Sequence, residues 1–306
     1  MPEVNNPDVT VVTPSFNQGA FIEETILSVL NQHGATIEYL VMDGGSADGT
    51  LDILKKYAGR LEYISEKDRG QADAINKGLQ RSHGRIVAYL NSDDTYFPGA
   101  VDRAVRFLDR HPEFAMVYGE GYHVDAQGRL LERYYTERFD FRRLAEICYI
   151  CQPTVFLRRE VLSSIGYFDA GLRFCMDYDY WIRVGKRYAV GYIPEYLAAS
   201  RLHSETKTLS QRIQFHEEIV RTIKRHYGHV PMRWISAYAH AYLGKYLSRD
   251  TRARDQVFSI LVRLIFFIKY IAVNRKIPLH EFMERLRPQN DWDGDITETA
   301  GPSHKL

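Results

Sequence analysis

The sequence is poor in cysteine, in long apolar runs and in charge of one sign. Its 306 residues include three cysteines, and the Cys148 and Cys151 pair has no second pair or histidine that would complete a zinc site. No uninterrupted run reaches the roughly 18–20 apolar residues that span a bilayer. The opening MPEVNNPDVTVV is unlike a signal peptide. We therefore expect a protein of the reducing cytoplasm.

The charge is balanced, because 40 basic side chains stand against 39 acidic ones and the net charge is +1. This balance predicts no nucleic-acid partner, since nucleic-acid binders usually carry a basic excess. Two phosphate-binding patterns are also missing. The sequence has no G-x-x-x-x-G-K-[ST], and its first strand-to-helix turn reads PSFNQG instead of G-x-G-x-x-G. These absences argue against a P-loop nucleotidase and a Rossmann dehydrogenase.

The first third of the chain alternates apolar strands with amphipathic helices. Runs rich in β-branched residues predict the strands, and segments of about ten residues with helical spacing follow them. The predicted strands are 8–13, 37–43, 61–65 and 85–90, and the predicted helices are 20–32, 50–58, 71–82 and 98–110. Apolar strands that alternate with helices favour a parallel sheet that is covered on both faces.

The second half of the chain mixes strands and helices and then becomes helical. We expect two strands in 115–135, a helix in 175–187 and strand structure in 190–203. The predicted organisation is an α/β domain over 1–208 with halves 1–112 and 113–208, a helical region over 209–287, and a disordered tail over 288–306. The tail is assigned from its polar composition.

Polar side chains follow the end of every predicted strand in the first half. They are Asn17, Asp43, Asp68 and the adjacent pair Asp93 and Asp94. In open α/β sheets the ligand lies beyond the carboxyl ends of the strands, so we expect these side chains to share one crevice. Carboxylates repel a diphosphate unless a divalent cation lies between them. An alternative is that the adjacent pair caps the helix predicted to follow it.

Four short segments resemble those of the family 2 glycosyltransferases with a GT-A fold, and they occur in the family's order. They are TPSFN (13–17), MDGGSADGT (42–50), DRGQADAINKG (68–78) and LNSDD (90–94). The resemblance continues to RLHSETK (201–207), roughly two-thirds of the chain. It implies a GT-A fold with a mixed, mainly parallel sheet covered by helices, and it leaves the C-terminal helices as an all-helical extension.

The resemblance also implies ligands. The donor is a nucleotide-diphospho sugar, with a UDP-sugar favoured, and the cofactor is Mn²⁺ or Mg²⁺. The implied donor contacts are Thr13, Pro14, Phe16, Asn17, Asp43, Asp68, Asn76, Asn91 and Ser92, and the implied metal ligands are Asp93, Asp94 and His203. The first aspartate of the family's D-x-D is Asn91 here, which shifts the expected metal site towards Asp93.

The segment CMDYDYW (175–181) resembles the one that carries the family's general base, and it aligns Asp177 with that base. Inverting transfer to a hydroxyl needs a carboxylate opposite the leaving diphosphate. Asp177 and Asp179 cannot share one face of a helix, so we expect one of them to face the crevice. Met176 replaces the family's preceding glutamate. The alternative is that Asp177 only caps its helix.

The stretch QVFSILVRLIFFIKYIAV (256–273) is the most apolar part of the chain. Arg263 and Lys269 interrupt it, and a helix there has a broad apolar face. We expect this face either to make peripheral contact with the inner face of a membrane, or to pack on the catalytic domain or on a second subunit as a homodimer. The acceptor implied by the resemblance is a glycan or a lipid-linked molecule.

The sequence therefore predicts an inverting, metal-dependent glycosyltransferase. The processive Q-x-x-R-W pattern is missing, which favours the addition of one sugar or a few. One alternative is a sugar-nucleotide pyrophosphorylase, although TPSFNQGAF lacks the glycine-rich, basic loop of such enzymes. Another is a catalytically inactive GT-A domain that binds carbohydrate or a partner, which Asn91 and Met176 would fit.

Overall fold

The computed structural model describes residues 6–203, 211–247 and 252–277. The strands are β1 (Val9–Ser15), β2 (Ile37–Asp43), β3 (Glu62–Ser65), β4 (Ile86–Tyr89), β5 (Thr95–Tyr96), β6 (Phe114–Val124), β7 (Leu130–Arg133), β8 (Phe156–Arg158) and β9 (Ala189–Arg201). The helices are α1 (Ile22–Leu30), α2 (Thr50–Lys56), α3 (Gln71–Arg81), α4 (Ala100–Arg110), α5 (Arg143–Glu146), α6 (Glu160–Ile165), α7 (Met176–Gly185), α9 (Arg212–Tyr227), α10 (Met232–Gly244) and α11 (Arg252–Asn274). The alternation predicted for the first third is confirmed, with each boundary within two residues.

One sheet runs through the molecule in the order β3-β2-β1-β4-β8-β6-β9-β5, and β7 pairs with β6. The first four strands are parallel to one another. The strand β8 is antiparallel to both of its neighbours, and β6 and β9 are parallel again. The predicted mixed α/β fold is therefore confirmed, and the parallel strands β1, β2 and β4 direct their carboxyl ends to one edge.

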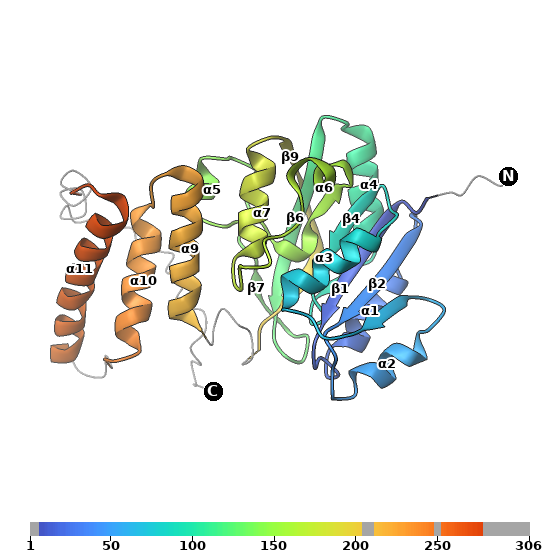
Figure 1. Ribbon diagram of the computed structural model, residues 1–306, viewed down its shortest axis with the longest axis horizontal. Coiled ribbons are helices and arrows are strands. Elements are labelled where there is room, and N and C mark those ends of the chain that lie inside the picture. Colours follow the sequence, from blue (N-terminus) through green and yellow to red (C-terminus); the bar gives the residue numbers. More distant parts are fainter. Residues whose placement is uncertain (1–5, 204–210, 248–251, 278–306) are drawn as a thin grey trace.

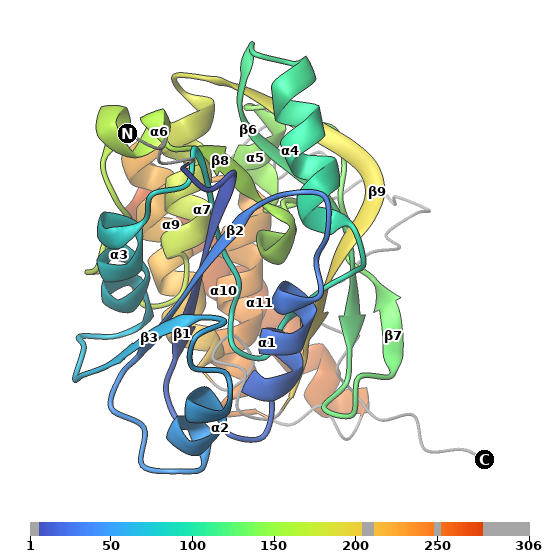
Figure 2. The ribbon, with the colours of Figure 1, turned by 90° about the vertical axis from the view of Figure 1, so that its right-hand side faces the viewer.

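The strand β1 lies inside the parallel part of the sheet. All seven of its residues are buried, as expected for a β-branched strand that is covered on both faces. On one of these faces α3 approaches closely, because a Cβ on Gly78 would lie 2.4 Å from Cγ1 of Val12. Figure 2 shows α3 on one side of β1 and β2, with α1 and α4 on the other. This layering fixes the loops that leave the carboxyl end of β1.

Two apolar cores lie on the two faces of the sheet. The core with α1, α2 and α4 includes Ile22, Leu54 and Val101. The core on the other face includes Ile75 of α3 and Trp181 of α7, and it continues into the C-terminal helices. Helix α7 is therefore packed between the sheet and the helical region.

The helices α9, α10 and α11 stand side by side at one end of the molecule, with α9 innermost (Figure 1). Ile219 and Ile223 of α9 and Trp234 of α10 belong to the same core as Trp181. The indole N–H of Trp234 donates to the carbonyl of Ala145 at 2.8 Å. The predicted helical region is confirmed for these three helices. The boundary predicted at 208, the last part (278–287) of the predicted helical region and the tail over 288–306 lie outside the described residues.

Helix α11 has two apolar faces. One is buried, with Phe258, Val262, Phe266 and Tyr270 in the core, and the other exposes Val257, Ile260, Leu264 and Ile268. Within Arg254–Asn274, an 18-residue window has a mean hydropathy of 1.9, and 22% of that window is buried. By length and composition the helix would suffice to cross a membrane, although the sequence contains no uninterrupted apolar run of that length.

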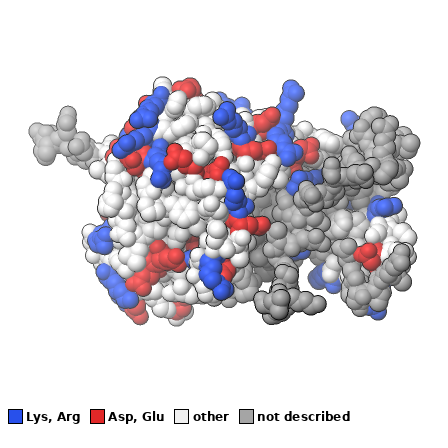
Figure 3. Space-filling view, turned by 180° about the vertical axis from the view of Figure 1, so that it is seen from behind, with Lys and Arg blue, Asp and Glu red and all other residues white. Residues whose placement is uncertain are grey.

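Two expectations from composition concern the surface and the cysteines. Basic and acidic side chains are interspersed among the described residues on the face seen in Figure 3. All three cysteines are free thiols, with Cys151 and Cys175 buried and Cys148 partly buried. The C-x-x-C spacing thus belongs to the packing of the loop before β8.

Candidate active site

The loops that follow β1 and β2 are joined by hydrogen bonds. The N–H of Asn17 donates to Oγ of Ser46 at 2.8 Å, and the N–H of Ala47 donates to Oδ1 of Asn17 at 2.9 Å. The N–H of Gly19 donates to Oδ2 of Asp48 at 2.8 Å. Asn17 has a φ of 53°, a left-handed conformation that asparagine tolerates better than most residues. Asn17 therefore joins the loop after β1 to the loop after β2.

Asp43, at the end of β2, is buried and accepts hydrogen bonds from the loop after β2 and from the end of β3. Its Oδ2 accepts the N–H of Ser46 at 2.9 Å and the hydroxyl of Ser65 at 2.6 Å. Of the residues expected to contact the donor, Thr13 and Pro14 are buried within β1, and the Thr13 hydroxyl lies 3.1 Å from that of Tyr39. Asp43, Thr13 and Pro14 are therefore buried at the carboxyl ends of β1 and β2.

Phe16 and Asp68 lie at the rim. The Phe16 side chain is 59% exposed, which is unusual for a large aromatic residue. A Cβ on Gly44 would lie 2.7 Å from a carboxylate oxygen of Asp68 and 3.3 Å from the Phe16 ring. Asp68 also accepts the N–H of Gly70 at 2.8 Å. The glycine thus lets an exposed ring and a carboxylate approach the same strip of backbone.

Asp93 and His203 form a pair between the loop after β4 and the segment after β9. Oδ2 of Asp93 lies 3.0 Å from Nε2 of His203, although the two residues are 110 positions apart in the sequence. The His203 ring also packs against Phe21, with 4.9 Å between the ring centroids. The fold therefore brings together two of the three residues that the resemblance assigned to the metal.

Asp94 is the third of these residues, and it is buried. Its Oδ1 accepts the N–H of Arg201 at 2.9 Å, and its Oδ2 accepts Nδ2–H of Asn91 at 3.0 Å. Burial raises the pKa of Asp94 to about 8, and the negative charge of Asp93 adds to the effect. The N-cap of α4 is Gly99, five residues beyond Asp94, so capping does not account for the acidic pair. Ser92 is buried beside them.

Asn91 is held by the protein on every side of its amide. Its Nδ2 donates to Oε1 of Gln152 at 3.0 Å as well as to Asp94, and its Oδ1 accepts Nε2–H of Gln71 at 2.7 Å. Gln152 in turn donates to the carbonyl of Tyr89 at 2.9 Å. These bonds show that the Asn91 amide orients Asp94, and the donor contact expected of Asn91 stays a prediction.

The donor set around Asp93 suits a divalent cation. Adjacent ligands around an octahedral cation, each at about 2.1 Å, are about 3 Å apart, which is close to the separation of Asp93 and His203. No group of three or more His, Cys, Asp or Glu side chains that could hold a metal is found in the described ranges. A cation here would thus need ligands from its substrate or from water, as Mg²⁺ sites often do.

Asn76 is not part of this cluster. Its Nδ2 donates to the carbonyl of Phe168 at 2.8 Å, and its Oδ1 accepts the N–H of Phe168 at 3.0 Å. This paired contact fastens α3 to the segment that leads towards α7, and the donor contact expected of Asn76 stays a prediction.

Asp177 and Asp179 have different environments, as their spacing predicted. Asp179 is buried and accepts hydrogen bonds from Arg183 at 2.9 Å, Arg225 at 2.7 Å and His226 at 2.6 Å. Asp177 is partly buried, and the hydrogen bond to its side chain comes from the adjacent N–H of Tyr178 at 2.7 Å. The N-cap of α7 is Cys175, so Asp177 is not the capping residue.

Asp177 and Asp94 have electrostatic effects on the same two phenols. Burial raises the pKa of Tyr89, and the carboxylates of Asp177 and Asp94 raise it further. The same two carboxylates raise the pKa of Tyr134, where burial is again the main cause. Burial raises the pKa of Asp177 itself to about 6, and the negative charge of Glu218 adds to it. A carboxylate with such a pKa can accept a proton near neutral pH.

Three residues that organise the site could not be identified from the sequence. Arg201 holds Asp94 through its N–H and donates from Nε to the carbonyl of Asp93 at 2.9 Å. Tyr89 is buried at the end of β4, and Glu218 of α9 accepts the N–H of Cys175, two residues before Asp177. An arginine after a strand and a glutamate in a helix are too common for their roles to be recognised without the fold.

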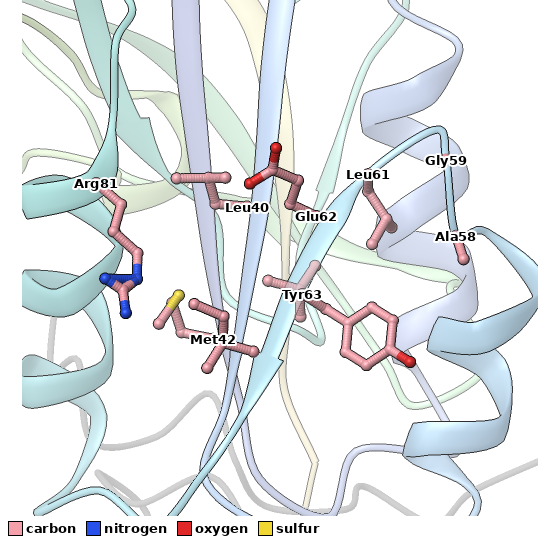
Figure 4. A pocket seen from close by; sticks show the side chains of 10 residues that line it. Leu40, Met42, Ala58, Gly59, Leu61, Glu62, Tyr63 and Arg81 are labelled. Carbon is pink, nitrogen blue, oxygen red and sulfur yellow. The ribbon is translucent and has the colours of Figure 1, made fainter.

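A separate hollow of about 260 Å³ lies beside the edge strand β3. Figure 4 shows Arg81 on one side of it and Ala58 and Gly59 on the other, with Leu40 and Met42 between. Its lining includes none of the predicted site residues. Its volume is slightly below the roughly 300–1,000 Å³ of ordinary ligand pockets.

Comparisons with known proteins identify the class of this fold. Staphylococcus aureus TarS in complex with UDP-GlcNAc has a TM-score of 0.59 at 18% identity, over 90% of this chain and 92% of that chain. A mannosyltransferase from Pyrobaculum calidifontis in complex with GDP-Man and Mn²⁺ has a TM-score of 0.57 at 18% identity, over 89% and 84%. The protein therefore has the GT-A fold of glycosyltransferases, as the sequence predicted.

The sequence comparisons give the family. The profile of glycosyl transferase family 2 matches residues 10–166, just over half of the chain. An uncharacterized glycosyltransferase from Rickettsia prowazekii is 26% identical over 228 residues, which are 71% of this chain and 71% of the relative. The chain belongs to glycosyl transferase family 2, and it is a glycosyltransferase. The pyrophosphorylase and inactive-domain alternatives are therefore wrong.

Proposed function

We propose that the protein transfers a sugar from a nucleotide-diphospho sugar to a hydroxyl group, with inversion at the anomeric carbon. The observation that carries this proposal is the pairing of Asp93 and His203, whose side chains come within 3.0 Å of each other although 110 positions separate them. Asp177, from a different part of the chain, and Asp94 both raise the pKa of Tyr89, where burial is the main cause. An inverting transferase needs a place for the leaving diphosphate and a separate carboxylate for the acceptor.

The donor is proposed to lie along the loops after β1 and β2. The exposed ring of Phe16 offers a stacking surface for a base, and the Asp68 carboxylate beside it offers an acceptor for ribose hydroxyls. The structural neighbours carry UDP-GlcNAc and GDP-Man, which supports a nucleotide sugar as donor. We favour a UDP-sugar.

The leaving diphosphate is proposed to lie against Asp93 and His203. A divalent cation bound by these two side chains would neutralise the charge that develops on the diphosphate. Mn²⁺ or Mg²⁺ fits a site with carboxylate and water ligands. The Mn²⁺ in the mannosyltransferase complex supports this assignment. Asn91 and Arg201 act on the cluster by orienting Asp94.

Asp177 is proposed as the general base. Its carboxylate takes the proton of the acceptor hydroxyl while that oxygen bonds to the anomeric carbon, and the bond from this carbon to the diphosphate oxygen breaks. The proton ends on Asp177, and the electron pair of the broken bond leaves with the nucleoside diphosphate. The raised pKa of Asp177 suits this role, because a base with a pKa nearer to the working pH is stronger.

The acceptor is proposed to be a glycan or a lipid-linked molecule at the cytoplasmic face of a membrane. The exposed apolar face of α11 would rest on the lipid surface, with Arg263, Arg275 and Lys276 exposed near it to meet anionic headgroups. Flotation with vesicles that contain anionic lipid tests this contact. We expect the wild-type protein to bind the vesicles and the Leu264→Glu variant to lose this binding. If the protein does not bind vesicles but forms a dimer through this face, the face is a subunit contact instead.

The central experiment measures the release of nucleoside diphosphate from a panel of nucleotide sugars, with Mn²⁺, Mg²⁺ or chelator. We expect turnover with one donor class that requires a divalent cation. Asp93→Ala should reduce it roughly 100-fold or more, because several kcal/mol of charge stabilisation are lost. Asp52→Ala is the matched control, since that carboxylate lies on the surface of α2 and pairs with Lys55.

Two results would contradict the proposal. Unchanged turnover in a folded Asp93→Ala variant would remove the metal assignment. A folded protein that releases no nucleoside diphosphate from any nucleotide sugar, whichever cation and acceptor are supplied, would remove the donor class.

A further inference from the structure

Glu218 is a buried carboxylate that belongs to helix α9, outside the loops that form the crevice. It is 5% exposed, and its bonds in the described structure come from N–H groups and a thiol. Oε1 accepts the N–H of Phe174 at 2.7 Å and that of Cys175 at 2.9 Å, and Oε2 accepts the N–H of Arg173 at 3.0 Å. The Cys175 thiol lies 3.3 Å from Oε1. Several N–H donors stabilise the charged form of a buried carboxylate.

These N–H groups lead directly into α7. The first N–H groups of a helix have no partner within the helix and need an acceptor from elsewhere. Among the described residues, no local side chain caps α7 at Cys175. Glu218 accepts the N–H of Cys175, the N-cap residue, and those of the two residues before it, from a helix more than forty positions away in the sequence. Asp177 is the second residue of α7, so the chain that Glu218 holds is the chain that presents the proposed base.

A second contact between the same two helices lies one turn further along. Asp179 accepts hydrogen bonds from Arg225 at 2.7 Å and from His226 at 2.6 Å, and both donors belong to α9. Helix α9 therefore hydrogen-bonds to the chain at the start of α7 and to its first turn. Two such contacts fix the rotation of α7 about its axis, and this rotation decides which side chains of α7 face the crevice.

We propose that Glu218 is a positioning residue for the transfer reaction, which sets both the orientation and the electrostatic surroundings of Asp177. This proposal rests on the proposed function of Asp177 as general base. It makes the C-terminal helices part of the acceptor side of the active site, because they supply a group on which the base depends.

The charge of Glu218 is distinctive among the groups that face Asp177. The other groups that interact electrostatically with Asp177 are Tyr89 at the end of β4, Tyr134 just after β7, Cys148 before β8 and Cys175 at the N-cap of α7. Burial raises the pKa of each of these phenols and thiols, so they are neutral near pH 7. Glu218 is the neighbour whose negative charge raises the pKa of Asp177. It thereby makes Asp177 a stronger base.

The first test is Glu218→Gln, which keeps an oxygen acceptor for the N–H groups and removes the charge. We expect the acid limb of the pH profile of kcat to move to lower pH by about half a unit or more, because the nearby negative charge is lost. The KM for the donor should be unchanged. Glu217→Gln is the matched control, since Glu217 is the adjacent residue of α9 and its carboxylate meets Tyr238 of α10 instead.

The second test is Glu218→Ala, which also removes the acceptor. We expect kcat to fall roughly tenfold or more with an unchanged donor KM, because three N–H groups lose their partner and α7 can turn. Glu218→Gln should retain more activity than Glu218→Ala. If Glu218→Ala does not fold, the pH profile of Glu218→Gln decides the matter.

Asp177→Asn in the same series separates the two proposals. Near-normal kcat in Asp177→Asn would overturn the proposed base itself. An inactive Asp177→Asn, together with Glu218→Gln whose kcat and acid limb equal those of the wild type, would overturn the role of Glu218 and leave the proposed function standing.

Discussion

The two sides of the crevice are built differently. The donor side consists of loops that follow neighbouring parallel strands, and these loops hydrogen-bond to each other through Asn17, Ser46 and Asp48. The side that carries Asp177 depends on α7, whose position is set by Glu218 and His226 of α9. The family profile, which matches residues 10–166, contains the first side and ends before the second.

This difference indicates where the enzyme is general and where it is particular. The donor site proposed for the sheet and its strand-end loops is one that any member of the family could share, because parallel strands bring these loops together. The base is presented by a helix whose support comes from the C-terminal helices. We therefore expect changes on the donor side to alter donor affinity, and changes around α7 to alter the rate of transfer or the stability of the protein.

The largest effect is expected from Asp177→Asn. Asparagine has nearly the same shape but cannot take a proton, so kcat should fall roughly 1,000-fold, within the range for loss of a general base. Steady-state kinetics measure the rate, and calorimetric titration with a nucleoside diphosphate should show unchanged affinity. Weakened nucleotide binding would place Asp177 on the donor side and break the comparison.

Asp179→Ala, two residues further along α7, should instead destabilise the protein. It leaves Arg183 and His226 without their buried partner, and we expect the free energy of unfolding to fall by about 3 kcal/mol, the lower end of the range for a broken buried ion pair. Urea denaturation measures it. Asp169→Ala is the control, because its pair with the half-exposed Arg225 should contribute less than about 1 kcal/mol. Equal losses in the two variants would contradict the assignment.

The pH dependence follows from the raised pKa of Asp177. The base works only when it is deprotonated, and its pKa in the folded protein is about 6. The value of kcat should therefore be steady above about pH 7 and fall roughly tenfold per pH unit below 6. A pH profile at saturating donor measures this limb. A limb that persists at the same pH in the residual activity of Asp177→Asn would assign it to another group.

Phe16→Ala should have the smallest effect, and the effect should be on donor binding. Loss of a stacking ring should raise the donor KM roughly tenfold, within the range measured for base–aromatic stacking, and leave kcat nearly unchanged. Tyr246→Ala removes another exposed ring at the end of α10 and should leave both constants as they are. A change in kcat instead of KM would show that Phe16 serves the transfer step.

Most of the fold could be predicted from the sequence. On the donor side, the sequence also predicted which strand ends carry the candidate residues. Strands with continuous apolar residues and helices with a clear period leave few alternatives. Asn17, Asp43 and Asp93 each stand at a strand end, so their convergence follows from the topology alone. The pairing of Asp93 with His203 needed the resemblance as well, because 110 residues separate them.

The individual contacts could not be predicted. Asn91 and Asn76 were expected to touch the donor, yet each has its amide satisfied by the protein: Asn91 by side chains from three segments, and Asn76 by the backbone of Phe168. An amide looks the same in a sequence whether its partner is a ligand or a neighbouring loop. Glu218 gave no signal for the same reason, since a glutamate in a helix usually lies on the surface.

The contact between Glu218 and the start of α7 has a consequence for how such enzymes can diverge. A lineage that exchanged its C-terminal helices by recombination would exchange the partner of its base at the same time. The two segments must therefore be inherited together or change in step. The donor loops hydrogen-bond to one another, so they can change without a matching change in the C-terminal helices.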